Sequence, residues 1–115
     1  MSTQHNWITV CRDTDLVTNS GVCALLNEQQ IALFKIKSAN DEKIFAVSNW
    51  DPIGKANVLY RGLLGSVQDA KVIISPLYKQ RYCLESGQCL DDDAIKLIVY
   101  PVRIEQNHVQ LQWVD

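Results

Sequence analysis

The sequence has little histidine, proline or glycine, and it contains no long hydrophobic run. Its 115 residues include two histidines, three prolines and five glycines. A Ser-His-Asp or Cys-His catalytic arrangement needs a histidine, and His5 lies near the N-terminus while His108 lies in an expected hairpin turn. The longest unbroken apolar run covers residues 22–26, whereas a membrane-spanning helix needs about 20 apolar residues. These shortages argue against a membrane protein and a histidine-dependent hydrolase.

An excess of charge of one sign is also missing. Eleven Lys and Arg residues face thirteen Asp and Glu residues, which leaves a net charge of −2. This balance gives no electrostatic reason to expect nucleic acid or an anionic membrane as a partner, so a protein or a small ligand is more compatible. Residues 1–6 have neither the basic start nor the apolar core of a signal peptide. We therefore expect a cytoplasmic protein.

The cysteines form no Cys-x-x-Cys pair, which is the spacing that zinc sites usually present. The four of them stand at positions 11, 23, 83 and 89. A disulfide framework needs an oxidising compartment, so the pattern favours half-buried or buried thiols, although Cys83 and Cys89 flank one turn. The acidic run Asp91–Asp93 favours an exposed corner over a cation site, and no glycine-rich phosphate loop is present. The sequence predicts no catalytic, cofactor or metal site in this chain.

What is present is a series of short apolar stretches separated by polar turns, which is typical of a β-sandwich or small barrel. The last stretch alternates cleanly, with Val109, Leu111 and Trp113 on one face. Four-residue turns are expected at 27–30 and 67–70, and a short helical turn at Thr14 or Asp15. We predict a single all-β domain over residues 1–115, with strands at 7–11, 22–26, 31–36, 44–48, 72–74, 97–104 and 109–114. Two further strands are expected on either side of a glycine turn at 85–88.

Two stretches share a β run that ends in a residue-Pro step, Asp51-Pro52 in one and Ser75-Pro76 in the other. Together they resemble the paired metal-binding loops of Rieske iron–sulfur domains, whose patterns are C-P-H-x-G and C-P-x-H-G. In that family two thiolates and two imidazoles hold a two-iron cluster. The resemblance implies a Rieske-like β-sandwich or small barrel, with both proline-containing loops at one tip. The four ligand positions here hold Asp51, Ile53, Ser75 and Tyr78. Because these residues replace the cysteines and histidines, we expect no cluster.

A narrower resemblance covers nearly the whole chain, from Trp7 to Trp113. The runs Asp-Pro-x-x-x-Ala-Asn-Val-Leu at 51–59, Ser-Pro-Leu-Tyr-Lys-Gln-Arg at 75–81 and Gly-Gln-Cys-Leu-Asp-Asp at 87–92, with Arg61-Gly62, are similar to the small subunits of bacterial assimilatory NAD(P)H-dependent nitrite reductases. The resemblance implies a non-catalytic subunit of a complex that reduces nitrite to ammonium. It also implies a large-subunit partner that carries FAD, a nicotinamide site, siroheme and an iron–sulfur cluster.

The loop tip is the candidate contact surface. Exposed apolar and aromatic side chains usually mark interaction sites, and Lys79 and Arg81, two apart on an expected extended segment, should form a positive rim on one face. An alternative is that Ile53 and Tyr78 fold inward and fill the volume that the cluster occupies in the family. The predicted partner-binding residues are Trp50, Pro52, Tyr78, Lys79 and Arg81.

Two other functions remain open at this point. One is an electron-transfer ferredoxin of the Rieske type with an atypical cluster, and the other is a stand-alone protein-binding module unrelated to nitrogen metabolism. An iron assay with a visible spectrum separates the first from a cluster-free subunit. A pull-down from cells grown on nitrate separates the second.

Overall fold

A computed structural model describes residues 6–114 as an all-β arrangement with two short 3-10 helices. The all-β prediction is confirmed, and the short helical turn at Thr14 and Asp15 is η1 (Asp13–Asp15). The other elements are β1 (Ile8–Arg12), β2 (Ser20–Leu26), β3 (Gln29–Ser38), β4 (Asp41–Ser48), β5 (Trp50–Asp51), β6 (Ala56–Asn57), η2 (Leu59–Arg61), β7 (Leu63–Val67), β8 (Ala70–Ile74), β9 (Arg81–Cys83), β10 (Val102–Glu105) and β11 (His108–Leu111).

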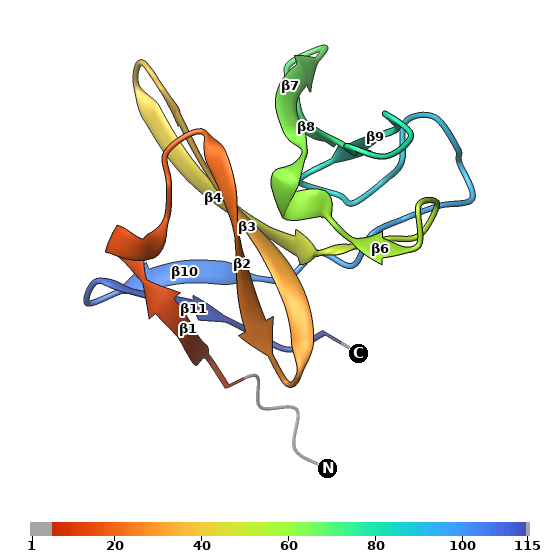
Figure 1. Ribbon diagram of the computed structural model, residues 1–115. Coiled ribbons are helices and arrows are strands. Elements are labelled where there is room, and N and C mark those ends of the chain that lie inside the picture. Colours follow the sequence, from red (N-terminus) through yellow and green to blue (C-terminus); the bar gives the residue numbers. More distant parts are fainter. Residues whose placement is uncertain (1–5, 115) are drawn as a thin grey trace.

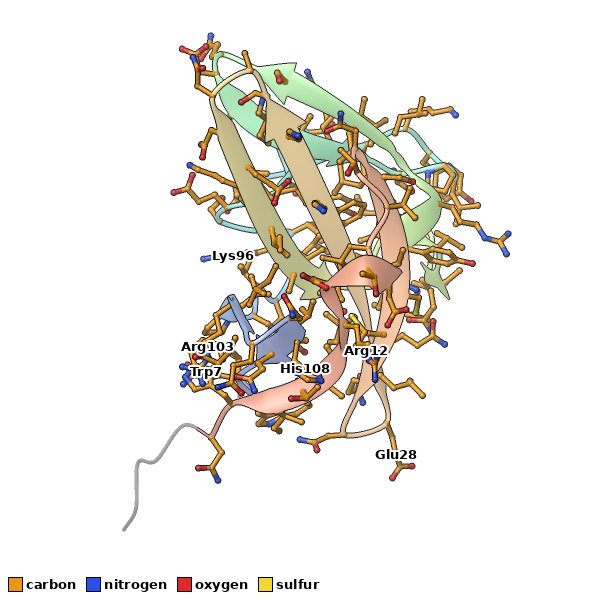
Figure 2. The ribbon with its side chains drawn as sticks, turned by 90° about the vertical axis from the view of Figure 1, so that its left-hand side faces the viewer. Trp7, Arg12, Glu28, Lys96, Arg103 and His108 are labelled. Carbon is orange, nitrogen blue, oxygen red and sulfur yellow. The ribbon has the colours of Figure 1, made fainter. Side chains whose placement is uncertain are left out.

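The strands form three antiparallel three-stranded sheets and one two-stranded ribbon (Figure 1). A central sheet has the order β2-β3-β4, and the sheets β1-β11-β10 and β7-β8-β9 lie on either side of it, while β5 and β6 form the ribbon. The first and last strands pair, with Ile8 opposite Leu111. On that sheet the Arg103 guanidinium carbon lies 4.4 Å from the ring centroid of Trp7 (Figure 2).

Strand β3 is buried on both faces and connects the two hydrophobic cores. Ile31 and Leu33 point into one core, which also contains Val109 and Leu111 from β11. The alternate residues of β3, Ala32 and Phe34, point into the other, together with Ile73, Leu59, Tyr82 and Leu84. Successive side chains of a strand point to opposite faces, so a continuous apolar run suits a strand that is covered on both sides. This central layer fixes the positions of the strands that lead into the two proline loops.

The hairpin turns are tighter than the sequence predicts. Asn27 and Glu28 alone form the first turn, with φ values of 50° and 66°, so the predicted four-residue loop at 27–30 is wrong and β3 already begins at Gln29. The turn at 67–70 likewise narrows to Gln68 and Asp69, both with positive φ. Two-residue turns with this geometry match the right-handed twist of the paired strands. Polar residues next to the turn can join the strand because they face solvent.

The C-terminal region also departs from the prediction. The expected strand at 97–104 is reduced to β10 because Pro101 lacks the N–H that a ladder needs. Upstream of Pro101, Val99 makes only an isolated bridge to Val47. His108 is the exposed first residue of β11, and His5 lies outside the described residues. No helix within residues 6–114 has the length and apolar character needed to span a membrane.

Candidate functional site

The two proline loops meet at one tip through a direct side-chain contact. Asp51 ends β5, and Ser75 follows β8. The Ser75 hydroxyl donates a hydrogen bond of 2.5 Å to Asp51 Oδ2, and both side chains are fully buried. The predicted meeting of the loops is therefore confirmed, and the contact joins the two positions that hold cysteine in the Rieske patterns.

Each loop begins with the same local turn. The Ile53 N–H donates to Asp51 Oδ1 at 3.0 Å, and the Leu77 N–H donates to Ser75 Oγ at 3.2 Å. Asp and Ser favour such turns because a short side-chain oxygen can reach the backbone N–H two residues later. The proline between them fixes its own φ and keeps the preceding residue extended. The two loops are thus local structural counterparts.

Each loop also ends in the same way, on a lysine. The Lys55 N–H donates to the Asp51 carbonyl at 2.6 Å, and the Lys79 N–H donates to the Ser75 carbonyl at 3.2 Å. Both lysines have a left-handed backbone, with φ values of 58° and 64°. A lysine therefore stands where each Rieske pattern has its final glycine, and it keeps a conformation that glycine adopts more easily.

The centre of the tip is the Asp51 carboxylate, which accepts five hydrogen bonds. Oδ1 accepts from the Ile53 and Gly54 N–H groups at 3.0 and 3.1 Å, from Gln80 Nε2 at 2.6 Å and from the Tyr82 hydroxyl at 2.9 Å. Oδ2 accepts from Ser75. All of these donors are neutral, so dipoles alone surround a buried negative charge, without a cationic side chain in contact.

These contacts set the ionisation of two buried groups. Burial alone would raise the pKa of Asp51, but hydrogen bonds from Ser75, Gly54, Tyr82 and Ile53 outweigh it and hold that pKa below its usual range. Burial raises the pKa of Tyr82, and the neighbouring Asp51 charge adds to the rise against the opposing hydrogen bond from Gln80. At neutral pH the carboxylate is ionised, and the phenol keeps the proton that it donates.

Gln80 and Tyr82 are the members of the site that sequence reasoning missed. Both are buried, and Gln80 Nε2 also lies 3.1 Å from the Tyr82 hydroxyl. Gln80 Oε1 is the one buried side-chain oxygen within residues 6–114 that has no hydrogen-bond partner. No local pattern marks these two residues, because Gln80 lies before β9 and the left-handed backbone of Lys79 interrupts the extended alternation.

The other two ligand positions lie outside this centre. Ile53 is half-buried and packs against the core that contains Leu59 and Tyr82. Tyr78 is 69% exposed, so the alternative in which Tyr78 folds inward as a plug is wrong, and Gln80 and Tyr82 approach Asp51 instead. Trp50 is 45% exposed and Leu77 44%, and Pro52 is half-buried. The exposed tip therefore presents Trp50, Leu77 and Tyr78.

The predicted positive rim has a different geometry from the one expected. Lys79 has a left-handed backbone, so the segment is not extended there and the argument that Lys79 and Arg81 share a face is wrong. Arg81 forms an ion pair with Asp91, in which Nη2 lies 2.8 Å from Oδ1 and Nε 3.3 Å from Oδ2. Hydrogen bonds from Arg81 lower the pKa of Asp91. The charge of Arg81 is thus balanced within the chain.

The residues at the tip do not fit a Rieske cluster. The two thiolate positions hold a carboxylate and a hydroxyl that bond to each other, and the two imidazole positions hold an aliphatic chain and a phenol. Cys83 and Cys89 lie elsewhere, and the pairing of Tyr82 with Cys89 puts Cys83 and Cys89 on opposite faces. Within residues 6–114, no group of three or more His, Cys, Asp or Glu side chains gathers around a common point.

Known proteins resemble the chain over nearly its whole length. The family of the Rieske-like [2Fe-2S] domain matches residues 6–112. The nitrite reductase (NADH) small subunit of Escherichia coli K12 is 37% identical over 106 residues, which are 92% of this chain and 96% of that protein. The solution structure of the nitrite reductase NAD(P)H small subunit from Erwinia carotovora superposes with a TM-score of 0.77 at 41% identity, over 95% of this chain and 82% of that one.

A third relative contains a similar segment within a much longer chain. A segment of the nitrite reductase NAD(P)H large subunit of Klebsiella oxytoca is 37% identical over 103 residues, which are 90% of this chain but only 10% of that protein. The matches to the two small subunits cover more than nine tenths of this chain. The chain therefore belongs to the family of the Rieske-like [2Fe-2S] domain and, within it, to the nitrite reductase small subunits.

Proposed function

We propose that the chain is the non-catalytic small subunit of an NAD(P)H-dependent nitrite reductase, which reduces nitrite to ammonium in nitrate and nitrite assimilation. The observation that carries this proposal is the 37% identity over 92% of the chain to a nitrite reductase small subunit. The similar segment within a large subunit of the same enzyme class adds support, because a domain that is covalently part of one partner in one protein is a natural non-covalent partner in another.

The residues at the tip support a complex in which the large subunit, and not this chain, carries the redox cofactors. The ligand positions of this chain hold no thiolate or imidazole, and we propose that the large subunit carries the redox groups, namely FAD, siroheme and an iron–sulfur cluster. We propose a cytoplasmic location and a single domain over residues 1–115, which the family match over residues 6–112 supports. The electron-transfer alternative needs a cluster, and the tip offers no ligand set for one.

The tip is proposed as the docking surface on the large subunit. Both loops are stiffened by proline and by the buried bonds of Asp51 and Ser75, and a stiff loop loses little conformational entropy on binding. The loops hold exposed aromatic rings at the surface, and tyrosine, tryptophan and arginine are the residue types enriched in binding hot spots. The proposed contact residues are Trp50, Pro52, Tyr78, Lys79 and Arg81.

The proposal is tested by co-expressing this chain with the large subunit of the same organism. NAD(P)H-dependent nitrite reduction is measured with and without the chain, and binding is measured by titration of the purified partners. We expect a stable complex, with Trp50→Ala weakening binding by an amount near 2 kcal/mol, roughly thirtyfold. Unchanged affinity of Arg81→Ala would remove Arg81 from the interface, and the absence of any complex would overturn the proposal.

The cluster-free state has its own test. We expect the anaerobically purified protein to be colourless and to contain no stoichiometric iron or sulfide, because Asp51, Ile53, Ser75 and Tyr78 replace the ligands. Iron and acid-labile sulfide assays with a visible spectrum measure this directly. Two irons per chain would favour the ferredoxin alternative. A pull-down from nitrate-grown cells that lacks the large subunit would favour a stand-alone binding module.

A further inference from the structure

The two loop lysines hold a backbone conformation that costs free energy. Nine non-glycine residues within residues 6–114 have positive φ. Six of them lie as adjacent pairs in the two-residue hairpin turns at 27–28, 68–69 and 106–107, where the turn geometry requires it. A seventh, Asn19, is of a type that tolerates this region. The remaining two are Lys55 and Lys79, at equivalent positions of the two loops.

The lysine side chain offers no local compensation for this conformation. The left-handed region costs a residue with a Cβ about 1 kcal/mol or more, and the short polar side chain that offsets the cost in Asn or Asp is missing from lysine. Residues with a strained backbone persist where the surrounding structure holds them, and they concentrate at functional sites. The feature that glycine could not supply at these positions is the lysine side chain itself.

The charges of both lysines are available for a partner. Lys55 and Lys79 are exposed, and the ion pairs within residues 6–114 involve other residues, Lys35 with Glu42 and Arg81 with Asp91. The buried carboxylate beneath them takes its hydrogen bonds from neutral donors. The two lysines are therefore the uncompensated cations of the loops.

Their position relative to the exposed rings is set by the packing of the loops. Lys79 directly follows Tyr78, the most exposed aromatic residue of the tip. Lys55 directly follows Gly54, which lies so close to Leu77 that a Cβ at Gly54 would approach Leu77 Cδ1 to 2.4 Å. Lys79 thus follows a residue of the apolar surface formed by Leu77 and Tyr78, and Lys55 follows a residue that packs against it.

We propose that Lys55 and Lys79 form a paired cationic contact that binds carboxylates of the large subunit on either side of an apolar pocket for Leu77 and Tyr78. This inference rests on the proposed docking function and adds the chemistry of the partner surface, which is acidic around an apolar centre. Lysine suits this role because its compact charge on a flexible stem can follow a carboxylate as the surfaces meet. Charges at an interface rim act mainly on the association rate and on the salt dependence.

The experiment separates the charge from the backbone strain. Lys55→Gln and Lys79→Gln keep a side chain at positive φ but remove the charge, so the melting temperature should stay at the wild-type value. Each should bind the large subunit roughly threefold to fivefold more weakly at low salt, and the double variant should show a flatter dependence of affinity on ionic strength. Lys55→Gly and Lys79→Gly should bind equally weakly while melting at or above the wild-type temperature.

Asp69→Gly is the matched control, because Asp69 also has positive φ, at 71°, but lies in the β7–β8 turn away from the loops. It should melt at or above the wild-type temperature and bind with wild-type affinity. Wild-type binding by both Lys→Gln variants at low salt would overturn the inference, and so would a large loss of melting temperature in the Lys→Gly variants. If Trp50→Ala still weakens binding in that case, the docking function stands. If the wild-type chain forms no complex at any salt concentration, the proposed function itself fails.

Discussion

Asp51 and Asp91 are two carboxylates that the fold holds in opposite ways. Asp51 is fully buried and surrounded by neutral hydroxyl, amide and backbone N–H donors. Asp91 is exposed and bound by the Arg81 guanidinium. Hydrogen bonds lower the pKa in both cases, although at Asp51 they first have to outweigh burial. The comparison teaches that a buried charge in this fold is stabilised by fixed dipoles, whereas the ion pair is left to the surface.

We expect the largest loss of stability when the buried carboxylate is removed. Asp51→Ala leaves the hydroxyls of Ser75 and Tyr82, the Gln80 amide and two backbone N–H groups without their acceptor. Each buried donor without a partner costs about 1–3 kcal/mol, so we expect a loss of about 3 kcal/mol or more in the free energy of unfolding. Denaturant titration followed by circular dichroism measures this loss. A change within 1 kcal/mol would show that the bonds around Asp51 contribute little to stability.

The pH dependence of the free energy of unfolding in acid should also distinguish Asp51 from Asp91. Folding lowers the pKa of Asp51 below its ordinary value of 3.8, so its contribution is fully present above that value and is lost as the pH falls through the lowered folded pKa. Below about pH 4, the free energy of unfolding should therefore fall more steeply with acid in the wild type than in Asp51→Asn. The matched variant Asp91→Asn should keep most of the wild-type slope, because its exposed pair is screened by solvent. Equal slopes in wild type and Asp51→Asn would contradict the lowered pKa.

The two tyrosines at the tip provide a smaller contrast of the same kind. Tyr82→Phe removes a buried hydroxyl that donates to Asp51 and should reduce the free energy of unfolding by about 1–2 kcal/mol. Tyr78 is exposed, and Tyr78→Phe should stay within about 0.5 kcal/mol of wild type. Thermal melts of both variants measure the difference. A larger loss in Tyr78→Phe than in Tyr82→Phe would reverse the assignment of the inner and outer tyrosine.

The smallest effect is expected at the surface pair. Arg81→Ala removes the partner of Asp91 but leaves both positions in contact with water, and exposed ion pairs contribute little to stability. Its melting temperature should match that of the wild type in 0.15 M salt. A clear decrease in melting temperature would mean that the ion pair stabilises the contact between β9 and the acidic corner at Asp91–Asp93.

The fold and the meeting of the loops could be predicted from the sequence, but the inner half of the site could not. Alternation and proline placement are local signals, and they located most of the strands and the two residue-Pro steps. They missed β6 and β7 and made the strand at 97–104 too long. Which tyrosine faces inward depends on the positive φ of Lys79, which redirects the chain so that Gln80 and Tyr82 reach Asp51. A left-handed lysine has no sequence signature. The same backbone feature overturned the expected common face of Lys79 and Arg81.

The charge of Asp51 shows a second limit. A lone aspartate at a former ligand position is indistinguishable in sequence from an exposed loop acid, since its side-chain donors come from residues 24 to 31 positions away. Arg81 was predicted as a free positive charge, but it pairs with Asp91, which lies ten residues further along the chain across a turn. The burial of Asp51 and the pairing of Arg81 both depend on how separate segments pack, which local patterns do not encode.

The pairing of β1 with β11 has a consequence for the order of folding and for genetic fusion. This contact joins Ile8 to Leu111, so it closes the largest loop in the chain and should form late, after the local hairpin meander of β2, β3 and β4. It also places the two outermost strands side by side, and domains whose ends are adjacent tolerate circular permutation and insertion into other chains. A permuted chain joined across β1 and β11 and opened at the Gln68–Asp69 turn should therefore fold. The same geometry makes it straightforward for such a domain to occur as a separate protein or as a tenth of a longer one, as it does in the Klebsiella oxytoca relative.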